Sequence, residues 1–536
     1  MADGAEWWRG ATLYQIYPLS FKDSDGDGMG DLAGVTQKLA YIAGLGVAGI
    51  WLSPFFASPM KDFGYDVSDY KAVDPKFGTL ADFDRLVARA HDLGLKVIID
   101  QVWSHTSDQH PWFMESAASR DGPKADWYVW ADASADGTPP NNWQASFGGP
   151  SWTWRAARSQ YYLHNFLPSQ PDLNYWNADV QAAILDVAAF WLDRGVDGFR
   201  LDVINYLFHD PALTDNPPNP RATLHVQNGP PISPTRLQSH VHDRSQPQTL
   251  AFLARLRALV DARAGRMTVG EVVDVLALPR QIEYTAGADR LHTAYSFHFL
   301  AADHAGPALF QKAIASWAGA DGWPSWSLGN HDVSRFATRL AGDDPAHARV
   351  LMAALLSLPG TIFLYQGEEL GLPQAEIPFE RLADPFAIAQ WTGGAGRDGA
   401  RTPMPWTSEG PSAGFSSSAE TWLPVDPRHR ALAAEAQAAD SASMLAFTRR
   451  MISLRAGEDA LRLGAAELFE APEGVLAFTR ALGGDRVACV FELEGKSVEI
   501  ALSGEPVFLV TGAERLEAGR VRLPPHGGTI LRLGAP

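Results

Sequence analysis

The stretch Gly198-Phe-Arg-Leu-Asp-Val-Ile-Asn205 decides how the rest of this chain is interpreted. It is a short apolar run that carries two charged residues, Arg200 and Asp202, separated by one residue. Side chains of a β-strand alternate between its faces, so these two charges share one face while Phe199 and Leu201 take the other. An arginine beside a carboxylate lowers the pKa of that carboxylate and keeps it ionised. The octapeptide therefore fits either a structural salt bridge or an oriented nucleophile for covalent catalysis.

Length, charge and cysteine content restrict the class of the protein. A chain of 536 residues exceeds one ordinary hydrophobic core and predicts two to four domains. The net charge of −18 argues against nucleic acid or an anionic membrane as a partner and favours neutral or cationic ligands. The single cysteine, Cys489, excludes an internal disulfide and fits a reducing compartment.

Two segments bear on the location of the protein. The N-terminus has no basic region followed by an apolar core, so we expect no signal peptide. The most apolar run, Val350–Tyr365, is interrupted by Pro359 and Gly360, which predicts a buried helix and a buried strand instead of a membrane span. We therefore expect a cytoplasmic protein without membrane contact, as a monomer or a small homo-oligomer.

Short apolar runs alternate with amphipathic helical patterns over most of the chain. The predicted strands are Thr12–Pro18, Val47–Pro54, Lys96–Val102, Gly198–Val203, Met267–Val272, Ala294–Phe299, Ser325–Asn330 and Thr361–Gly367. Helical spacing recurs between most of them, as in Leu80–Leu93, Val180–Arg194, Thr249–Ala264 and Ala346–Leu358. Eight such strands indicate a closed (β/α)₈ barrel, and a doubly wound open sheet also fits the alternation. No Gly-x-Gly-x-x-Gly follows the first strand, so we favour the barrel.

Two insertions and one change of pattern divide the chain. Ser104–Asn177, after the third strand, is too long for a plain loop and predicts a small inserted domain. Leu372–Ala431, after the eighth strand, is a second insertion that precedes a final helix near Ser441–Arg455. Short alternating runs from about Gly464 predict an antiparallel β domain. The expected boundaries are a barrel at 1–104, 176–371 and 432–462, insertions at 105–175 and 372–431, and a β domain at 463–536.

Polar residues stand at the carboxyl ends of the predicted strands, where a barrel collects its reactive groups. They are Asp100, His105, Asp202, Glu271, His331 and Asp332. Each alone fits a helix cap or a local ion pair, but six on one rim are hard to explain by capping. A nucleophilic carboxylate and a proton-donating carboxyl are the minimal apparatus of a retaining glycosidase. Asp202 suits the nucleophile, and Glu271 suits the acid because its apolar neighbours raise its pKa.

Five motifs carry a resemblance to glycoside hydrolase family 13, the α-amylase family, in its α-glucosidase and oligo-1,6-glucosidase branch. They are Asp100-Gln-Val-Trp-Ser-His105, Gln170-Pro-Asp-Leu-Asn174, Gly198-Phe-Arg-Leu-Asp202, Gly270-Glu271 and Asn330-His-Asp332. They stand in the family's order, and the resemblance covers the chain from residue 7 to about 460. It implies an α/β fold: a TIM barrel with a domain B after strand three and a C-terminal antiparallel β-sandwich.

The resemblance also implies roles for single residues. Asp202 would be the nucleophile, Glu271 the acid/base, and Asp332 the residue that holds sugar hydroxyls and stabilises the transition state. The first subsite would be completed by Arg200, His105, His331 and Tyr65, the last of which stacks on the bound glucose.

Two further pairs are candidates for the substrate pocket. Asp62 and Arg401 match the pair that closes the pocket on the non-reducing glucose, which would make the enzyme exo-acting; the alternative is an exposed ion pair between loops. Phe147 and Phe166 in the inserted domain fit either the acceptor subsite or the core of that domain.

The chain departs from the family pattern at two positions. Ser104 stands where most of the family has asparagine, a calcium ligand of domain B in many α-amylases, which argues against a calcium ion there. Val203 follows the proposed nucleophile. In the oligo-1,6-glucosidase branch a valine at this place accompanies α-1,6 cleavage, while threonine or alanine accompanies α-1,4 cleavage.

The loop from Asp23 to Asp31 resembles the front of an EF-hand loop. Its carboxylates occupy positions one, three, five and nine, with a glycine at six, but Gly34 replaces the bidentate glutamate at twelve. An acidic, glycine-rich turn without an ion is the alternative. The family branch has a single-ion loop here, so the resemblance implies one structural Ca²⁺ or Mg²⁺ far from the catalytic rim. Its ligands would be Asp23, Asp25, Asp27, the Met29 carbonyl and Asp31.

The sequence thus predicts an exo-acting retaining α-glucosidase that hydrolyses short α-glucosides such as maltose or sucrose through a glucosyl–Asp202 intermediate, with transglucosylation and no organic cofactor. A dedicated transglucosidase, a sucrose isomerase or an oligo-1,6-glucosidase would share the same motifs, because water access to the acceptor subsite separates them. A non-catalytic relative, like the heavy chains of amino-acid transporters, would carry a membrane span and lack the catalytic carboxylates. This sequence shows neither feature.

Overall fold

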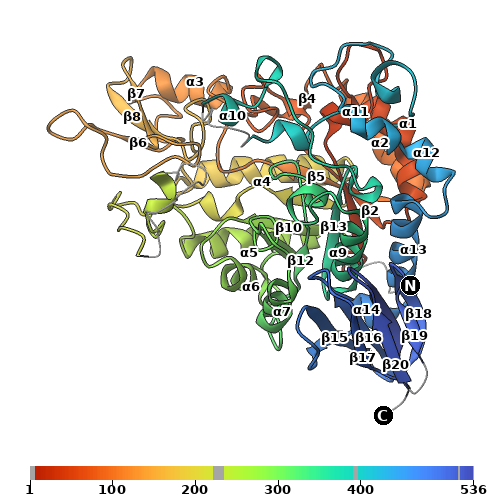
Figure 1. The fold of residues 1–536 in the computed structure, drawn as a ribbon. Coiled ribbons are helices and arrows are strands. Elements are labelled where there is room, and N and C mark those ends of the chain that lie inside the picture. Colours follow the sequence, from red (N-terminus) through yellow and green to blue (C-terminus); the bar gives the residue numbers. More distant parts are fainter. Residues whose placement is uncertain (1–5, 221–233, 390–395, 517–518, 535–536) are drawn as a thin grey trace.

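Eight parallel strands form the centre of the computed structural model, which describes residues 6–220, 234–389, 396–516 and 519–534 (Figure 1). They pair in the order β11-β10-β9-β5-β2-β1-β13-β12. A parallel bridge between Ala294 and Pro324 joins the two ends of this order, so the predicted barrel is confirmed. The strands are β1 (Thr12–Ile16), β2 (Gly49–Leu52), β5 (Lys96–Gln101), β9 (Gly198–Leu201), β10 (Met267–Val272), β11 (Thr293–Ser296), β12 (Ser325–Trp326) and β13 (Thr361–Tyr365).

The interior of the barrel follows from the alternation of side chains along each strand. Leu13, Trp51 and Phe363, from three neighbouring strands, belong to one buried apolar cluster. Arg200 points to the same side, because its guanidinium carbon lies 4.9 Å from the centre of the Trp51 ring. Phe199 belongs instead to the large cluster that includes the surrounding helices. The two faces predicted for the octapeptide are therefore present.

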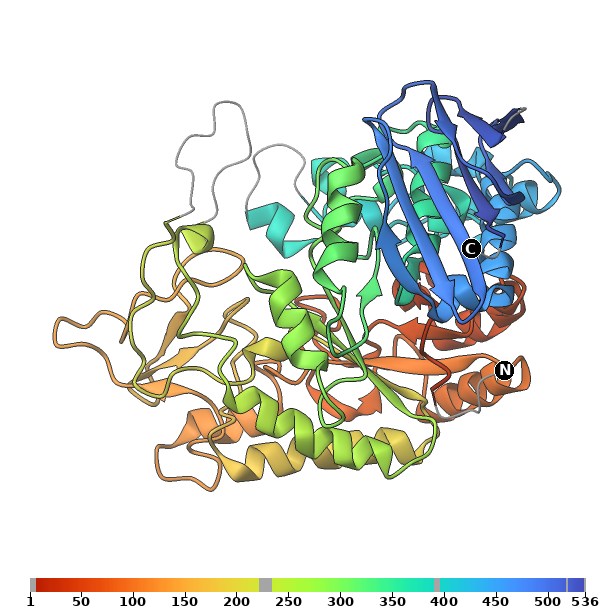
Figure 2. The ribbon, with the colours of Figure 1, turned by 90° about the horizontal axis from the view of Figure 1, so that it is seen from below.

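Helices cover the outside of the barrel (Figures 1 and 2). The principal ones are α1 (Leu32–Ala43), α2 (Leu80–Asp92), α4 (Ala178–Asp193), α5 (Gln248–Asp261), α6 (Ala277–Thr285), α7 (Pro307–Ser316), α9 (Pro345–Ser357) and α13 (Met444–Gly457). Side chains fix where several of them begin, since the first backbone N–H groups of a helix need acceptors. Asp31 caps α1, Asn177 caps α4, and Thr79 forms a capping box with Asp82 at α2.

The chain between β5 and α4 leaves the barrel and folds separately. It contains α3 (Pro111–Ala118) and an antiparallel sheet of β6 (Trp130–Ala131), β7 (Trp152–Arg155) and β8 (Gln160–Leu163). Its own small core consists of Val129, Trp143, Trp152 and Leu163. This sheet lies at the end of the molecule opposite the C-terminal strands (Figures 1 and 2). A two-stranded sheet, β3 (Phe56–Ala57) and β4 (Asp69–Val73), follows β2.

The chain after β13 has little regular structure among its described residues. It contains short turns and helices: η5 (Phe379–Arg381), α10 (Pro385–Ala389), η6 (Asp398–Ala400), η7 (Pro411–Gly414) and α11 (Pro427–Ala431). Met404 N donates to Ser20 O at 2.8 Å, and Trp406 Nε1 donates to Phe21 O at 2.7 Å. These bonds hold the segment against the loop that follows β1.

The C-terminal residues form two antiparallel sheets, of five and three strands, that share one apolar core. The strands are β14 (Ala465–Leu468), β15 (Val475–Leu482), β16 (Asp485–Glu492), β17 (Val498–Ala501), β18 (Glu505–Val510), β19 (Glu514–Leu516), β20 (Arg520–Leu523) and β21 (Gly528–Arg532). The predicted β-sandwich is confirmed. The short alternating runs that predict this domain do not include β19 and β20, which have only three and four residues.

Residues 1–5, part of the N-terminus on which the expectation of no signal peptide rests, lie outside the described residues. In the described part of the chain, no helix is both long enough and apolar enough to cross a membrane.

Candidate active site

Arg200 joins three carboxylates at the carboxyl ends of three adjacent strands. Its Nη1 atom lies 2.8 Å from Asp100 Oδ1 and 2.5 Å from Asp202 Oδ1, and its Nη2 atom lies 2.6 Å from Glu271 Oε2. The side chain of Arg200 is fully buried. Tyr295 adds a hydroxyl that accepts from Arg200 at 2.7 Å and donates to Glu271 at 3.2 Å. The pair of the octapeptide is thus one part of a larger charged network.

The backbone turns sharply directly after Asp202. Val203 has φ 35° and ψ 47°, a left-handed conformation that is strained for a β-branched residue. β9 consequently ends at Leu201, two residues before the predicted end. The turn directs the N–H of Val203 to Glu271 Oε2, at 3.3 Å. It therefore links the backbone beside one carboxylate to the other carboxylate.

Burial raises the pKa of the acidic residues around Arg200. Glu271 is raised to about 8, in the predicted direction and by the predicted cause. For Asp202 the prediction was wrong: Arg200 lowers its pKa, but burial outweighs the arginine and raises it to about 7. The pKa of Asp202 nevertheless remains below that of Glu271, which is the order that a nucleophile and a proton donor require. Burial also raises the pKa of Asp100, to about 6.

Asp332 follows β12 and faces three basic side chains. Its carboxylate lies 2.8 Å from Arg401 Nη2, 3.5 Å from Arg397 Nη1 and 3.2 Å from His331 Nε2. Burial favours a higher pKa for Asp332, but His331, Arg401 and Arg397 outweigh burial and lower it. Asp332 is therefore a permanent carboxylate beside Asp202.

His331, Tyr65 and His105 form one connected wall. The rings of Tyr65 and His331 are stacked, with centres 5.3 Å apart and planes 4° apart. Gln15 Nε2 can only donate, and it lies 2.8 Å from His331 Nδ1, so the proton of this neutral ring is on Nε2. Burial lowers the pKa of His331 to about 3 and that of His105 to about 4. Gln170 connects His105 to the next carboxylate, with its Nε2 atom 3.2 Å from His105 Nε2 and 3.1 Å from Asp62 Oδ2.

The partner of Asp62 differs from the prediction. Arg397 Nη2, and not Arg401, lies 2.7 Å from Asp62 Oδ1. Arg401 points instead to the His331 carbonyl and to Asp332, at 2.7 and 2.8 Å. The two arginines stand on either side of the turn η6, so they reach neighbouring parts of one site from positions four residues apart in the sequence. The spacing alone does not say which of them reaches Asp62. The predicted pair is corrected accordingly.

These side chains surround a cavity of about 250 Å³. Its lining includes the predicted Asp62, Tyr65, His105, Asp202, Glu271, Asp332, Phe147 and Phe166. Of the two readings given to Phe147 and Phe166, the structure favours the cavity wall over the domain core. The sequence prediction missed Arg397, Tyr206, Phe297 and Phe386 on the same wall. Tyr206 ends η2 (Ile204–Tyr206), Phe297 follows β11 and Phe386 lies in α10, and no motif assigned any of them to the site.

The aromatic side chains of the wall contact one another in a row. The Phe147 ring lies 5.9 Å from Phe166 and 5.5 Å from Phe386. Phe166 in turn lies 5.4 Å from Tyr206 and 5.3 Å from His105. One side of the cavity is thus apolar and the other carries the carboxylates.

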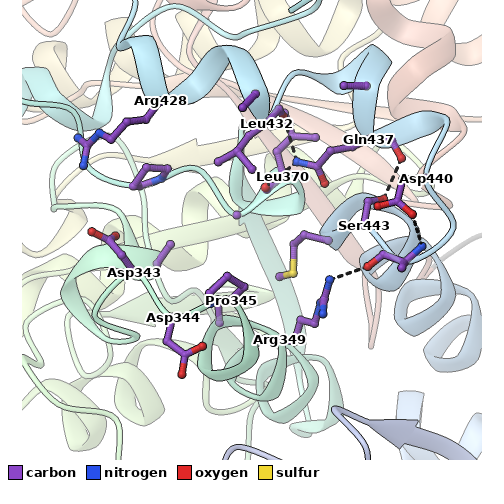
Figure 3. Close-up of a pocket in the computed structure, with 18 residues that line it drawn as sticks. Asp343, Asp344, Pro345, Arg349, Leu370, Arg428, Leu432, Gln437, Asp440 and Ser443 are labelled. Carbon is purple, nitrogen blue, oxygen red and sulfur yellow. Dashed lines mark hydrogen bonds between the residues drawn. The ribbon is translucent and has the colours of Figure 1, made fainter.

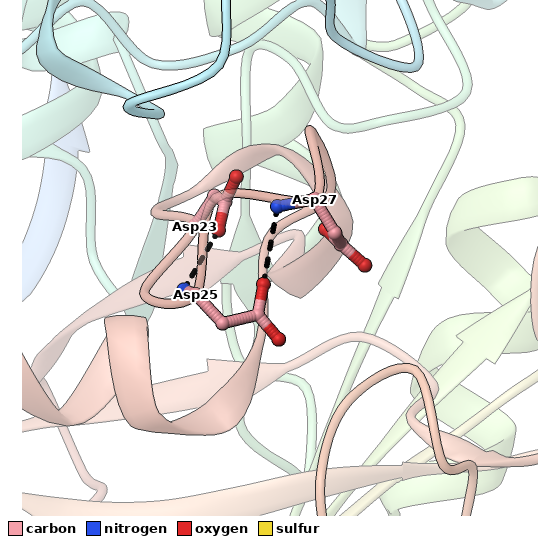
Figure 4. A group of neighbouring side chains, drawn as sticks. All are labelled: Asp23, Asp25 and Asp27. Carbon is pink, nitrogen blue, oxygen red and sulfur yellow. Dashed lines mark hydrogen bonds between the residues drawn. The ribbon is translucent and has the colours of Figure 1, made fainter.

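The acidic loop after β1 brings three carboxylates together (Figure 4). One oxygen each of Asp23, Asp25 and Asp27 lies within 4.8 Å of the others, which fits the donor set of Ca²⁺ or Mg²⁺. Asp31 does not join this group in the described structure, because its oxygens accept from Gly34 N and from Ser24 at 2.7 to 2.9 Å. It caps α1 instead.

A second cavity, of about 400 Å³, lies between the start of α9 and the segment from α11 to α13 (Figure 3). Leu370, Leu432 and Met444 give it an apolar surface. The amide of Gln437 is already bound to the carbonyls of Leu370 and Leu432, at 2.8 and 2.9 Å. The residues that line this cavity include none of the predicted site residues.

Comparison with known proteins agrees with this geometry. Residues 15–464 match the family described as "Alpha amylase, catalytic domain". A Rhizobium meliloti (strain 1021) protein named "Probable alpha-glucosidase" is 48% identical over 98% of this chain and 97% of its own length. The oligo-1,6-glucosidase of Parageobacillus thermoglucosidasius is 34% identical over 99% of both chains.

Solved structures of similar proteins include a glucosyl transfer enzyme and a trehalulose synthase. The α-glucosyl transfer enzyme XgtA is 50% identical, with a TM-score of 0.93 over 98% of this chain and 99% of its own. The trehalulose synthase MutB from Pseudomonas mesoacidophila MX-45 is 31% identical, with a TM-score of 0.90 over 99% of this chain and 100% of its own.

Proposed function

The chain belongs to the α-amylase family and is a glycoside hydrolase of the α-glucosidase type, and on that premise we propose the role of each residue in its reaction. The observation that carries the proposal is the convergence of Asp202 and Glu271 on Arg200, with the pKa of Glu271 above that of Asp202. A retaining glycosidase needs this order, because one carboxyl must be ionised while the other still holds a proton.

The first step forms a glucosyl ester on Asp202. A carboxylate oxygen of Asp202 attacks the anomeric carbon, and the bond from this carbon to the glycosidic oxygen breaks. Glu271 gives its proton to that oxygen, so the aglycone leaves as an alcohol. Arg200 bonds to both carboxylates and holds them in place.

The second step reverses these roles. Glu271, now a carboxylate, takes a proton from water or from an acceptor hydroxyl, whose oxygen attacks the anomeric carbon. The ester bond to Asp202 breaks, and both carboxyls return to their first state. Water gives hydrolysis and a sugar hydroxyl gives transglucosylation, with retention of configuration in both cases.

The glucose pocket is formed by the carboxylate and histidine side of the cavity. Asp332, ionised throughout, suits hydrogen bonds to sugar hydroxyls and stabilisation of positive charge at the anomeric carbon. Tyr65, supported by His331, presents a ring for stacking on glucose. The contact between Arg397 and Asp62 closes the non-reducing side, which supports exo-action.

The substrate and the acceptor are the finer part of the proposal. Relatives named maltase, oligo-1,6-glucosidase and trehalulose synthase support short neutral α-glucosides such as maltose, isomaltose or sucrose. The apolar side with Phe147, Phe166 and Phe386 supports an acceptor subsite that restricts water. A dedicated transglucosidase or sucrose isomerase is the second candidate, favoured by the similarity to XgtA and MutB. Val203 on the cavity wall suits an influence on linkage preference.

A structural cation at Asp23, Asp25 and Asp27 completes the proposal. Burial and the neighbouring Asp25 raise the pKa of Asp27, as expected for acids gathered in one loop. A bound Ca²⁺ or Mg²⁺ would neutralise them and hold the loop, with no part in the reaction.

Asp202→Asn tests the mechanism. Turnover should fall by about 10⁴-fold or more, because the nucleophile is lost. The products of the wild-type protein with maltose, isomaltose, sucrose and starch, separated by chromatography, test the substrate class. Near wild-type activity of Asp202→Asn would contradict the mechanism, and rapid release of long starch fragments would contradict the closed pocket.

A further inference from the structure

Arg397 stands between three carboxylates at the closed end of the proposed glucose pocket. Its Nη2 atom lies 2.7 Å from both Asp62 Oδ1 and Asp384 Oδ1, and its Nη1 atom lies 3.5 Å from Asp332 Oδ1. Asp62 and Asp332 line the cavity, whereas Asp384 is fully buried and is not among the lining residues. Any influence of Asp384 on the substrate therefore passes through another side chain.

Asp384 holds Arg397 by its backbone and by its guanidinium. Asp384 Oδ2 accepts the backbone N–H of Arg397 at 2.8 Å. Arg397 Nε donates to the two carboxylate oxygens at 3.1 and 3.2 Å. A carboxylate bound to both parts of one arginine fixes the position and the direction of that side chain. Burial favours a higher pKa for Asp384, but Arg397 outweighs burial and lowers it, so Asp384 is charged.

The same carboxylate places an aromatic residue of the cavity wall. Asp384 Oδ1 accepts from Phe386 N at 3.0 Å, and the Phe386 ring lies 5.5 Å from Phe147. The guanidinium of Arg397 lies 5.1 Å from the same Phe147 ring. The Asp398 carboxylate accepts from the backbone N–H of Asp384 at 2.9 Å, and this bond fixes the backbone of Asp384.

The charges around Arg397 indicate where its guanidinium would move if Asp384 were lost. Without Asp384, the guanidinium would keep only Asp62 and Asp332 as anionic partners, and it would be drawn toward Asp332. Asp332 is the carboxylate that the sugar hydroxyls need, and it already pairs with Arg401 at 2.8 Å. A substrate would then have to displace Arg397 before it could bind.

We propose that Asp384 is a positioning residue that holds Arg397 on Asp62 and away from Asp332. This inference rests on the proposed α-glucosidase function. Through Arg397, Asp384 keeps the pocket closed at its non-reducing end and leaves Asp332 available to the sugar. The cost of its loss falls on the free enzyme, because a bound sugar restores the contacts of Asp332. The effect should therefore be seen in KM more than in kcat.

Asp384→Asn removes the charge and nearly keeps the shape. With p-nitrophenyl α-glucoside as the probe, KM should rise about tenfold or more, the scale of one lost charge-assisted hydrogen bond, while kcat changes much less. In an Arg397→Gln background, Asp384→Asn should not change KM further, because the side chain through which it acts is gone. Asp384→Glu carries the same test if Asp384→Asn does not fold: its change in KM must also vanish in the Arg397→Gln background.

Asp426→Asn is the matched control. Asp426 also accepts from the backbone N–H of an arginine two residues on, Arg428, at 2.8 Å, and it pairs with the guanidinium at 2.7 Å. It lies outside the catalytic cavity, so its loss should leave KM unchanged.

Three results would overturn the positioning role. They are a wild-type KM in folded Asp384→Asn, an additive effect in the Arg397→Gln background, and an equal rise of KM in Asp426→Asn. A wild-type protein without turnover on any α-glucoside would instead refute the proposed function, so the two failures are distinguishable.

Discussion

At the scale of single residues, Arg200 determines how charge is distributed in the site. It is the shared partner of Asp100, Asp202 and Glu271, and all three acids are buried. An isolated pair of Arg200 and Asp202 would leave Asp202 with a low pKa, which is what the sequence predicts. Burial and the neighbouring Asp100 raise this pKa, and neither effect is visible in an octapeptide.

The order of these pKa values predicts the pH dependence of the reaction. The active form has Asp202 ionised and Glu271 protonated, so kcat/KM should rise with pH up to about 7 and fall above about 8. Each limb should approach a slope of about tenfold per pH unit. Initial rates with p-nitrophenyl α-glucoside between pH 5 and 10 measure both limbs, with the range chosen to extend about two units beyond each pKa.

Glu271→Gln separates the two limbs. The variant has no titrating acid at this position, so its alkaline limb should disappear and its acid limb should remain. A 2,4-dinitrophenyl glucoside, whose leaving group needs no proton, should still give a burst of phenolate with this variant. An alkaline limb that persists in Glu271→Gln would assign that limb to another group and contradict the role of Glu271.

The sequence reveals the carboxylates of this site that lie on or next to strands, and it misses Arg397 and Phe386, which come from the segment after β13. Asp202 and Glu271 belong to runs with strand alternation, so the face of the sheet on which each side chain lies follows from its position in the run. Arg397 and Phe386 reach the cavity from a segment whose path is set by the buried Asp384 and Asp398, and the sequence does not signal these contacts. The prediction paired Asp62 with Arg401 instead of Arg397 for the same reason, because both arginines belong to this segment.

At the scale of elements, strands buried in the barrel were predictable and the short polar strands β19 and β20 of the C-terminal domain were not. The eight barrel strands are short and mostly apolar, as expected when helices cover one face and a packed interior the other. β19 and β20 carry Glu514, Arg520 and Arg522, which form ion pairs with other charged side chains at the surface. Their stabilisation comes from sheet pairing and a few buried residues such as Val521, a signal too short to recognise.

The acidic loop is an element whose stability should depend on a cation. Ca²⁺ or Mg²⁺ should raise Tm, by mass action worth about 2.7 kcal/mol at a hundredfold excess over Kd, and EDTA should reverse the shift. KM should not change, because the loop residues do not line the catalytic cavity. Differential scanning fluorimetry with and without EDTA measures the effect.

Two variants separate the cation from the loop's own hydrogen bonds. Asp25→Asn should abolish the cation-dependent shift and leave Tm in EDTA almost unchanged, because Asp25 is exposed and, within the described part of the chain, accepts only from Asp27 N. Asp23→Asn should lower Tm even in EDTA, because Asp23 accepts from three backbone N–H groups and from Ser416. A cation-dependent shift that survives Asp25→Asn would place the ion elsewhere.

At the scale of the whole molecule, one buried arginine ties together the beginning and the end of the barrel and the chain that leads to the C-terminal sheets. Arg455 of α13 donates to five backbone carbonyls, those of Gly10, Leu356, Leu358, Gly360 and Leu461. Gly10 precedes β1, and Gly360 precedes β13. Leu356 and Leu358 stand at the end of α9, and Leu461 belongs to α14 (Asp459–Leu463). Among the described residues Arg455 makes no ion pair, and burial lowers its pKa. Its guanidinium thus serves as a junction for the backbone.

Arg455→Lys should destabilise the protein without changing its catalysis. A lysine has three donors on one nitrogen and cannot reach all five carbonyls, and each buried carbonyl left without a donor costs about 1–3 kcal/mol. Tm at a fixed scan rate should fall by several degrees, while kcat and KM at 25 °C should match the wild type. Arg450→Lys is the control, because exposed Arg450 of the same helix has one hydrogen-bond acceptor among the residues that the structure describes, Ser441 O at 3.1 Å. An unchanged Tm in Arg455→Lys, or an equal fall in Arg450→Lys, would show that the junction does not stabilise the assembly of barrel and sandwich.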